Sequence, residues 1–302
     1  MRKLRILFCL SLLAGFSLPG QAMPIVKKVI FTQDSLIPSQ KYVTNFNLSS
    51  MQFHGGEVMG TTNATVPNIY YIWYGNWAGN SATSLLANLA LGLGTSLLYN
   101  INSTYADKNG NAVLPELKFP KPGVFDSYSS GTTIQKSDVL SIVTRAITNQ
   151  QLPLDSSGLY FVLTSSDIQE VSGFCTAYCG WHNSAMIQNT TIKYAFVGNP
   201  ERCPNACAAQ SVSLNNNPGA DAMANIVVHE IDKMVTNPNG DGWFDSNGQE
   251  NSDLCAWQFS NISKASNGAS YNIVIAGIKY LIQMNWLNIN GGSCAQTYHP
   301  SF

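Results

Sequence analysis

The sequence has few charged residues: Asp, Glu, Lys and Arg make up 11% of its 302 residues, whereas hydrophobic residues make up 45%. Disordered chains have the opposite balance, so this composition argues against disorder and allows a sizeable core, in one large domain or two small ones. The sequence also lacks internal repeats, a Gly-rich phosphate loop, a GxSxG elbow and a Rossmann fingerprint. The function classes marked by those motifs are therefore not indicated.

No segment after the first 22 residues is long and apolar enough to span a membrane. Residues 1–22 themselves have the pattern of a signal peptide: a basic start, the apolar run Ile6–Leu18, and small residues before a cleavage point after Ala22. An uncleaved anchor is the alternative. We therefore expect a secreted, extracellular protein, or a periplasmic one in a bacterial cell.

Positive charge is also scarce. Loss of Arg2, Lys3 and Arg5 with the leader takes the Lys and Arg count from 16 to 13 against 17 Asp and Glu, a formal charge of −4. Proteins that bind nucleic acid need basic patches to contact phosphates. We therefore expect no nucleic-acid partner.

Six cysteines remain after the leader, at positions 175, 179, 203, 207, 255 and 294. An even number in an exported chain indicates disulfides, with fifteen pairings possible in principle. We favour Cys255 with Cys294, and the other four cysteines paired among themselves. The alternative is a zinc site built from two C-x3-C pairs.

Three dense apolar and β-branched runs predict buried strands: Ile69–Tyr74, Leu159–Thr164 and Thr191–Val197. Helical periodicity lies between and after them, at residues 81–99 and 137–148 and in the stretch that starts at Asp221. Strands with helices between them predict a mixed α/β domain.

The stretch from Asp221 to Cys255 carries the clearest candidate site. Its apolar helix pattern includes the pair His229–Glu230 and ends at Asn237–Pro238, because proline disfavours a helical residue before it. A loop rich in oxygen ligands follows, with Asp241, Asp245, Glu250, Asn251 and Asp253. An HE pair on such a helix looks like part of a zinc hydrolase site, in which His binds the metal and Glu activates its water.

The second zinc ligand of an HExxH helix would fall at Lys233, and a protonated lysine cannot bind a metal. The predicted metal ligands are therefore His229 with Asp232, Glu250 and Asp253, and the predicted general base is Glu230. The acidic loop would suit Ca²⁺, which prefers oxygen ligands. The alternative is a buried His–Glu pair that only stabilises the helix.

The run HEIDKMVTNPNGDGWFDSNGQENSDLC resembles the phosphate-induced, EXORDIUM-like family, whose pattern is HE-x-x-E-x-x-TNP or TDP, an aromatic pair and E-x-x-D-x-C. Three further segments are similar to that family: IYYIWYGNW at 69–77, YCGWH to NPERCPNAC at 178–207, and GASYNIVIAG to INGGSC at 268–294. Together they cover roughly residues 65 to 296. The chain departs from the pattern at Lys233, where the family has Glu.

The resemblance implies a secreted protein linked to growth and the cell wall in plants, without a settled reaction. We expect an N-terminal extended segment at 23–66 and, at 67–302, a domain with a mixed central sheet, flanking helices, a zincin-like core and stabilising disulfides.

Two functions stay open. The first is a secreted, peptidase-like hydrolase that uses zinc. The second is a non-catalytic extracellular protein that binds wall carbohydrate or a protein partner, with Trp73, Trp77, Trp181 and Trp243 available for stacking.

Overall fold

The computed structural model describes residues 51–299. The expected leader, 1–22, and residues 23–50 of the expected N-terminal segment lie outside the described residues. None of the helices in the part that is described is long and apolar enough to cross a membrane.

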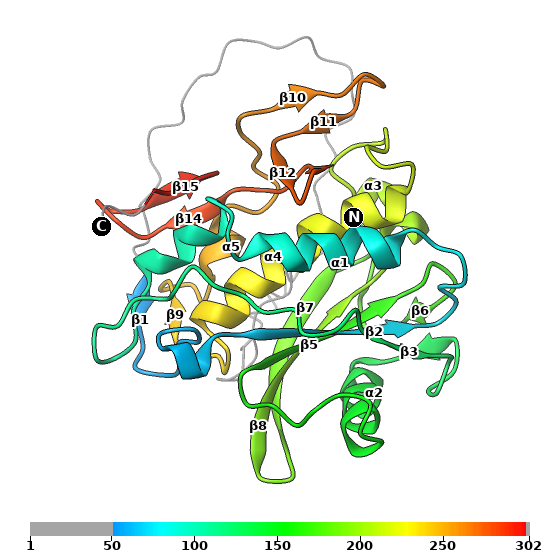
Figure 1. The fold of residues 1–302 in the computed structure, drawn as a ribbon, viewed down its shortest axis with the longest axis horizontal. Helices are drawn as coiled ribbons and strands as arrows, with labels where there is room; N and C mark the ends of the chain where they lie inside the picture. The colour runs from blue at the N-terminus through cyan, green and yellow to red at the C-terminus, as the bar shows by residue number, and fades with distance from the viewer. Residues whose placement is uncertain (1–50, 300–302) are drawn as a thin grey trace, which may run out of the picture.

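A five-stranded sheet forms the centre of the molecule (Figure 1). Its strands, in spatial order, are β3 (Val124–Asp126), β2 (Asn68–Tyr74), β5 (Gly158–Thr164), β8 (Thr190–Val197) and β7 (Gly180–Ile187). The first four run parallel, and β7 pairs antiparallel with β8. Every residue of β5 is buried, as expected of a strand covered on both faces. The predicted mixed sheet and its three apolar strands are therefore confirmed.

Helices cover both faces of the sheet (Figure 1). On one face lie α1 (Ala82–Leu93) and α4 (Pro218–Thr236), and on the other lies α2 (Lys136–Thr148). The helix predicted at 81–99 is shorter than expected, because α1 ends at Leu93. A Cβ at the following residue, Gly94, would lie 2.4 Å from the backbone nitrogen of Leu117, so this close approach admits only glycine.

The hairpin of β7 and β8 is an element that the sequence analysis did not predict in full. The turn residues Gln188 and Asn189 both have positive φ, 46° and 65°, which is the backbone of a type I′ hairpin turn. That turn brings His182 and Gly180 of β7 over α4, which contacts β7 and β8.

Short helices and strands complete the fold. Before the sheet come β1 (Gln52–Phe53) and η1 (Asn63–Thr65), and between its strands lie η2 (Tyr99–Thr104), β4 (Thr133–Ile134) and β6 (Gln169–Glu170). Between β8 and α4 lie η3 (Pro200–Arg202) and α3 (Pro204–Cys207). After α4 come β9 (Trp243–Phe244), α5 (Asn251–Leu254), β10 (Ser263–Lys264), β11 (Ser270–Tyr271), β12 (Ile273–Ile275), β13 (Ile278–Tyr280), β14 (Asn285–Leu287) and β15 (Ser293–Ala295). The described part of the expected N-terminal segment joins the domain, because β1 pairs with β9.

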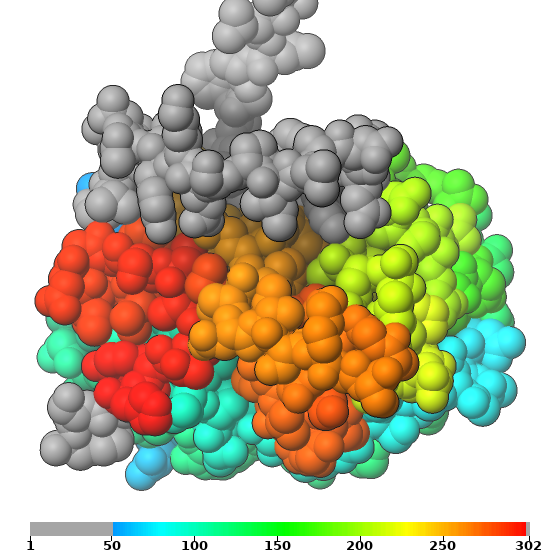
Figure 2. Space-filling model, turned by 90° about the horizontal axis from the view of Figure 1, so that it is seen from above, coloured from blue at the N-terminus to red at the C-terminus, as the bar shows by residue number. Residues whose placement is uncertain are grey.

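The C-terminal strands form hairpins over the side of the molecule on which α1 and α4 run; they are orange to red in Figures 1 and 2. As a result α4 lies between the sheet and this C-terminal layer, and every residue from Ala222 to Thr236 is buried. A helix buried all round is normally apolar. The polar residues of α4 therefore need partners inside the protein.

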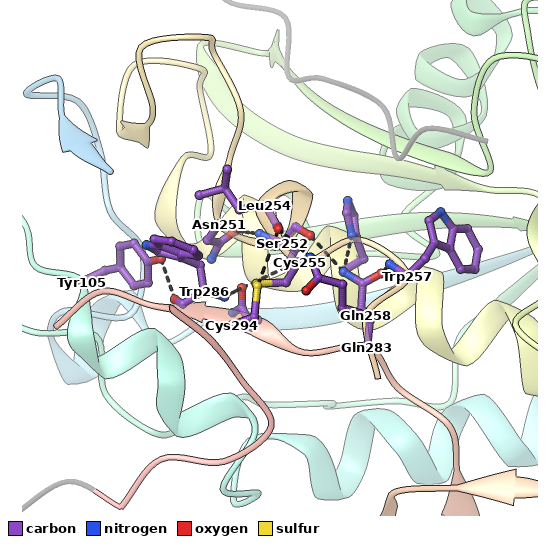
Figure 3. Close-up of a disulfide and its surroundings, with 12 residues drawn as sticks. Tyr105, Asn251, Ser252, Leu254, Cys255, Trp257, Gln258, Gln283, Trp286 and Cys294 are labelled. Carbon is purple, nitrogen blue, oxygen red and sulfur yellow. Dashed lines mark hydrogen bonds between the residues drawn. A yellow bond between two sulfur atoms is a disulfide. The ribbon is translucent and has the colours of Figure 1, made fainter. Parts of the chain in front are cut away.

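Three disulfides join the described residues: Cys175–Cys203, Cys179–Cys207 and Cys255–Cys294. The favoured pairing of the sequence analysis is confirmed. The two C-x3-C pairs do not form a zinc site, because each of their cysteines pairs with a cysteine from the other pair. The third disulfide joins the end of α5 to β15 (Figure 3).

Candidate functional site

All but one of the residues predicted to form the zinc site, Asp232 being the exception, meet at a buried cluster of polar and ionic side chains between α4, α5 and β7. We call it the Lys233 cluster; its members are His182, His229, Glu230, Lys233, Asn237, Glu250, Asp253 and Gln283. The side chains of His229 and Lys233 are wholly buried, and even Asp253 is only 9% exposed.

Lys233 lies at the centre of this cluster. Its Nζ is 2.9 Å from Oε2 of Glu250 and 3.2 Å from Oδ1 of Asp253. Burial alone would lower the pKa of Lys233, but the two carboxylates outweigh it, and the pKa is raised well above its usual range. The ammonium group is therefore a permanent cation held between two of the predicted metal ligands.

The same ion pairs keep the carboxylates charged. For Asp253, burial acts to raise the pKa, but Lys233 and the hydrogen bond from His229 lower it to about 2. For Glu250, burial again acts upward, and Lys233 and His182 bring the pKa below its usual value. Glu250 also accepts a 2.7 Å hydrogen bond from Asn237 Nδ2, and His182 Nε2 lies 3.2 Å from both its oxygens.

Both ring nitrogens of His229 are engaged. Gln283 Nε2 lies 3.0 Å from His229 Nδ1 and 3.0 Å from the carbonyl oxygen of Ser252 (Figure 3 shows Gln283 beside Ser252). The contact with this carbonyl oxygen identifies the Gln283 atom as the amide nitrogen, which can only donate. His229 Nδ1 therefore accepts a hydrogen bond from Gln283, and His229 Nε2 carries the proton, which it donates to Asp253 Oδ1 at 3.1 Å. Burial lowers the pKa of His229. The neutral ring thus has no free lone pair for a metal.

Glu230, the predicted general base, is buried, and its carboxyl oxygens have no hydrogen-bond partner among the described residues. Burial raises its pKa to about 8, so at neutral pH it is mostly protonated. It lies against Gly180 of β7, where a Cβ would be 3.3 Å from Glu230 Oε1 and 2.6 Å from Ile226 Cγ2. Glycine at that position leaves room for the carboxyl group.

Asp232 is not brought together with the other predicted ligands. Its Oδ1 accepts a 2.7 Å hydrogen bond from Asn102 in η2, and burial raises its pKa to about 7. In residues 51–299 no group of three or more His, Cys, Asp or Glu side chains has the geometry to hold a metal ion. With Lys233 between the carboxylates, these residues do not fit a zinc ion.

The acidic loop is committed in a similar way. Asp245 is buried and accepts hydrogen bonds from the backbone nitrogens of Asn247 and Gln249, at 2.7 and 2.8 Å, within its own turn. Asp241 is exposed. The loop oxygens are therefore divided between a turn, the solvent and the Lys233 cluster, and do not converge as Ca²⁺ requires.

A second candidate site is open to solvent at the carboxyl ends of β2 and β3. One hollow, of about 590 Å³, is lined by the loop after β2, residues 75–80, and by the segment after β3. A second, of about 390 Å³, lies beside it between α1 and β3. Both are lined by Thr83 and Phe125, so they form one surface, which we call the β2–β3 groove.

The groove lies outside the carboxyl ends of the parallel strands β2 and β3, at one edge of the sheet. From β2 the chain moves outward to β3, and from there it returns across β2 to β5 and continues to β8, so the direction of the chain across the sheet reverses between β2 and β5. Ligands of open α/β sheets bind outside the carboxyl ends of the strands, at such a reversal. The groove is therefore at the end of the sheet where ligands bind, beside the reversal rather than at it.

Hydrogen bonds fix the walls of the groove. The backbone nitrogen of Asn76 donates to Ser165 Oγ at 2.8 Å, and a Cβ on Gly75 would lie only 2.0 Å from that oxygen. Tyr128 has φ of 65°, a left-handed conformation that costs energy for a bulky residue, and its hydroxyl donates to Asp167 Oδ2 at 2.7 Å.

The four tryptophans considered for stacking are mostly core residues. Trp73, Trp77 and Trp181 are 1%, 3% and 3% exposed, and the half-buried Trp243 donates to the carbonyl oxygen of Ala106. The exposed aromatic ring of the groove is Phe125, at 59%. Sequence reasoning missed Phe125 because it lies in a short edge strand without periodicity.

The architecture and the site define a disulfide-linked α/β protein with a buried, lysine-centred ionic core. The family model described as phosphate-induced protein 1 conserved region matches residues 51–297, and the chain belongs to that family. Protein EXORDIUM-like 3 of Arabidopsis thaliana is 28% identical over 289 residues, 83% of this chain and 84% of the relative. Protein EXORDIUM-like 5 of the same plant is 26% identical over 300 residues, 86% and 81% of the two chains.

No solved structure gives a significant match to this chain. The resemblance stated from the sequence is confirmed for the family, whereas the zincin-like core and the metal ligands stay predictions. Protein EXORDIUM-like 1 of Arabidopsis thaliana, 31% identical over 151 residues, covers 40% of this chain.

Proposed function

We propose that this chain is a non-catalytic extracellular binding protein whose ligand site is the β2–β3 groove. The observation that carries this proposal is the contrast between the two candidate sites. The HE pair lies in a closed cluster centred on the ammonium group of Lys233. The groove, by contrast, is open to solvent, and the side chains that line it form no ion pairs within the described residues. The Lys233 cluster then serves to hold α4, α5 and β7 together.

The electrostatics of the cluster support a structural role. A general base in a hydrolase must reach a water molecule and be unprotonated at the working pH. Glu230 is wholly buried and carries a pKa raised to about 8, and residues 51–299 contain no group of three or more His, Cys, Asp or Glu side chains placed to hold a metal ion. A zinc-dependent hydrolase is accordingly the less favoured of the two functions that the sequence left open.

Three disulfides support the extracellular location. Disulfides persist in oxidising compartments and are rare in the cytosol. The resemblance to a secreted family points the same way.

Two experiments test this function. In the first, purified protein is incubated with casein, with and without a zinc chelator, beside the Glu230→Gln variant. We expect no hydrolysis by either protein. Hydrolysis by the wild type that the chelator and Glu230→Gln both abolish would overturn the proposal.

The second experiment locates the ligand site with a library of small neutral and charged organic fragments, observed by protein NMR. We expect bound fragments to shift the amide signals of residues 75–80 and of Phe125. Substitution of Thr83 by Trp, which fills the wall shared by the two hollows, should remove those shifts. Fragments that bind only elsewhere on the protein would contradict the assignment of the groove.

A further inference from the structure

The side chains that line the β2–β3 groove share one property: in the described part of the chain none of them is charged. They are glycine, alanine, proline, amide, hydroxyl and aromatic residues. Both hollows, at about 590 and 390 Å³, lie within the range of roughly 300 to 1,000 Å³ that is common for small-molecule sites. The groove is thus large enough for a ligand and offers it no ionic partner.

Several polar groups of the groove have unused hydrogen-bonding capacity. Asn76 accepts from the backbone nitrogen of Ala78 through Oδ1, which leaves its Nδ2 without a partner in residues 51–299. The side chains of Asn88 and Ser127 likewise make no hydrogen bond within the described residues. These donors and acceptors lie along both hollows and suit a ligand that carries hydroxyl groups.

Phe125 lies between the two hollows and provides an apolar surface. Its ring is 59% exposed, and the ring of Trp73 lies 6.5 Å behind it, centroid to centroid. An exposed aromatic face that lines two adjoining hollows gives a flat ligand ring a surface to stack on. With the polar groups on either side, the groove alternates apolar and hydrogen-bonding surface.

This combination discriminates between ligand classes. Arg and Lys side chains make the strongest hydrogen bonds to phosphates and carboxylates, and neither lines the groove, so an anionic ligand would find no charged side chain there. A purely apolar ligand would leave the amide and hydroxyl groups buried without partners, which costs free energy. A neutral sugar has hydroxyl groups around its ring and C–H groups on its faces, so it satisfies both kinds of surface.

The groove is also held in one shape before a ligand arrives. The Trp73 indole donates to the carbonyl oxygen of Pro122 at 3.0 Å, and a Cβ on Gly123 would lie 2.5 Å from Trp73 Nε1. Tyr128 is held by Asp167 in its left-handed conformation. A preformed site loses less conformational entropy on binding, which favours affinity.

We propose that the β2–β3 groove binds a neutral oligosaccharide, which stacks one sugar ring on Phe125 and extends into both hollows. This inference rests on the proposed function, because it names the ligand class of the same site. Asn76 and Ser127 bind the hydroxyl groups in the larger hollow, and Asn88 binds those in the smaller one.

Isothermal titration calorimetry with cellohexaose, xylohexaose and the anionic hexamer of galacturonic acid tests this inference. We expect at least one neutral hexamer to bind and the anionic hexamer to bind at least tenfold more weakly. Phe125→Ala should weaken binding of the neutral hexamer about tenfold, and Asn88→Ala should weaken it severalfold. The matched control is Met186→Ala: Met186 is 70% exposed on β7, the opposite edge of the sheet, and its loss should leave binding unchanged.

Thermal unfolding of each variant serves as the control for folding. We expect Phe125→Ala to be folded, because the Phe125 side chain is exposed in the wild type. Failure of both neutral hexamers to bind would overturn the saccharide inference. If fragments still map to the groove in that case, the proposed function stands; if they do not, both fall. Equal binding of the neutral and anionic hexamers, or full binding by Phe125→Ala, would also overturn the inference.

Discussion

Replacement of Lys233 by methionine tests whether the ammonium group is the internal cation of the buried cluster. Methionine has a similar length and apolar stem but lacks the charge and the N–H donors of the ammonium group. In the Lys233→Met variant, the carboxylates of Glu250 and Asp253 stay buried but lose their nearest cation. They must then either remain charged without compensation or take up protons.

The magnitude follows from the two distances. At an effective dielectric constant of about 20, ion pairs at 2.9 and 3.2 Å are worth roughly 6 and 5 kcal/mol. The cost of removing Lys233 from water, several kcal/mol, offsets part of this attraction. Loss of one partner from a buried pair costs about 3 to 5 kcal/mol overall, a large share of a stability of about 5 to 15 kcal/mol.

Urea denaturation followed by tryptophan fluorescence measures this loss. The matched control is Lys193→Met: Lys193 is also buried, but its partner Glu57, 2.9 Å away, has a side chain that is 41% exposed and can return to water. We expect the control to lose about 1 kcal/mol. Equal, small losses in the two variants would refute the reasoning, because the buried carboxylates would then not depend on Lys233.

Three further predictions concern stability. The pKa of Glu230 is raised from 4.5 to about 8, so the folded state keeps a proton that the unfolded state releases, and its contribution to stability should fall as pH rises from 4.5 to 8. The pKa of Asp253 is lowered from 3.8 to about 2, so its contribution should be lost as pH falls from 3.8 to 2. Urea midpoints should therefore decline below pH 3.8. They should also decline from pH 6.5 to 8, above the usual pKa of His229, and a midpoint that rises from pH 6.5 to 8 would contradict the account. Gly180→Ala should lower the free energy of unfolding by about 1 to 3 kcal/mol, because the added Cβ would lie 2.6 Å from Ile226 Cγ2 of α4; an unchanged urea midpoint would mean that the contact with α4 is loose. Replacement of both Cys255 and Cys294 by serine should cost about 4 kcal/mol, from the 39-residue separation that this disulfide closes, and calorimetry that shows no loss of thermal stability would oppose this estimate.

The sequence predicted those parts of the fold that depend on local pattern. The runs that became β2, β5 and β8 are dense in apolar and β-branched residues, and their type and position were clear. The strand β7 could not be recognised in the same way, because its sequence, GWHNSAMI, mixes small, polar and aromatic residues and follows a disulfide-rich loop. The apolar run at residues 273–286 likewise gave no period, because it divides into the short strands β12, β13 and β14.

The candidate site was harder to predict because its contacts join distant segments. The sequence placed His229, Glu250 and Asp253 in one site, and the structure brings them together. It treated Lys233 as an obstacle to metal binding, whereas the folded chain uses its charge to hold the carboxylates. Gln283, which fixes the protonation of His229, is 54 residues away in sequence and has no motif.

The β2–β3 groove left no signal in the sequence for a similar reason. Its walls come from the loop after β2, the start of α1 and the edge strand β3, and each is a short polar or glycine-containing segment. Only the order of the strands brings these segments to the same edge of the sheet.

Elemental analysis of the purified, dialysed wild-type protein tests most directly whether Lys233 takes the place of a metal ion. Lys233→Glu, which exchanges the cation for a carboxylate, is measured beside it. We predict no stoichiometric zinc or calcium in the wild type, because the ammonium group already neutralises Glu250 and Asp253. One equivalent of zinc in the wild type, lost on substitution of His229 by alanine, would contradict the account and restore the hydrolase.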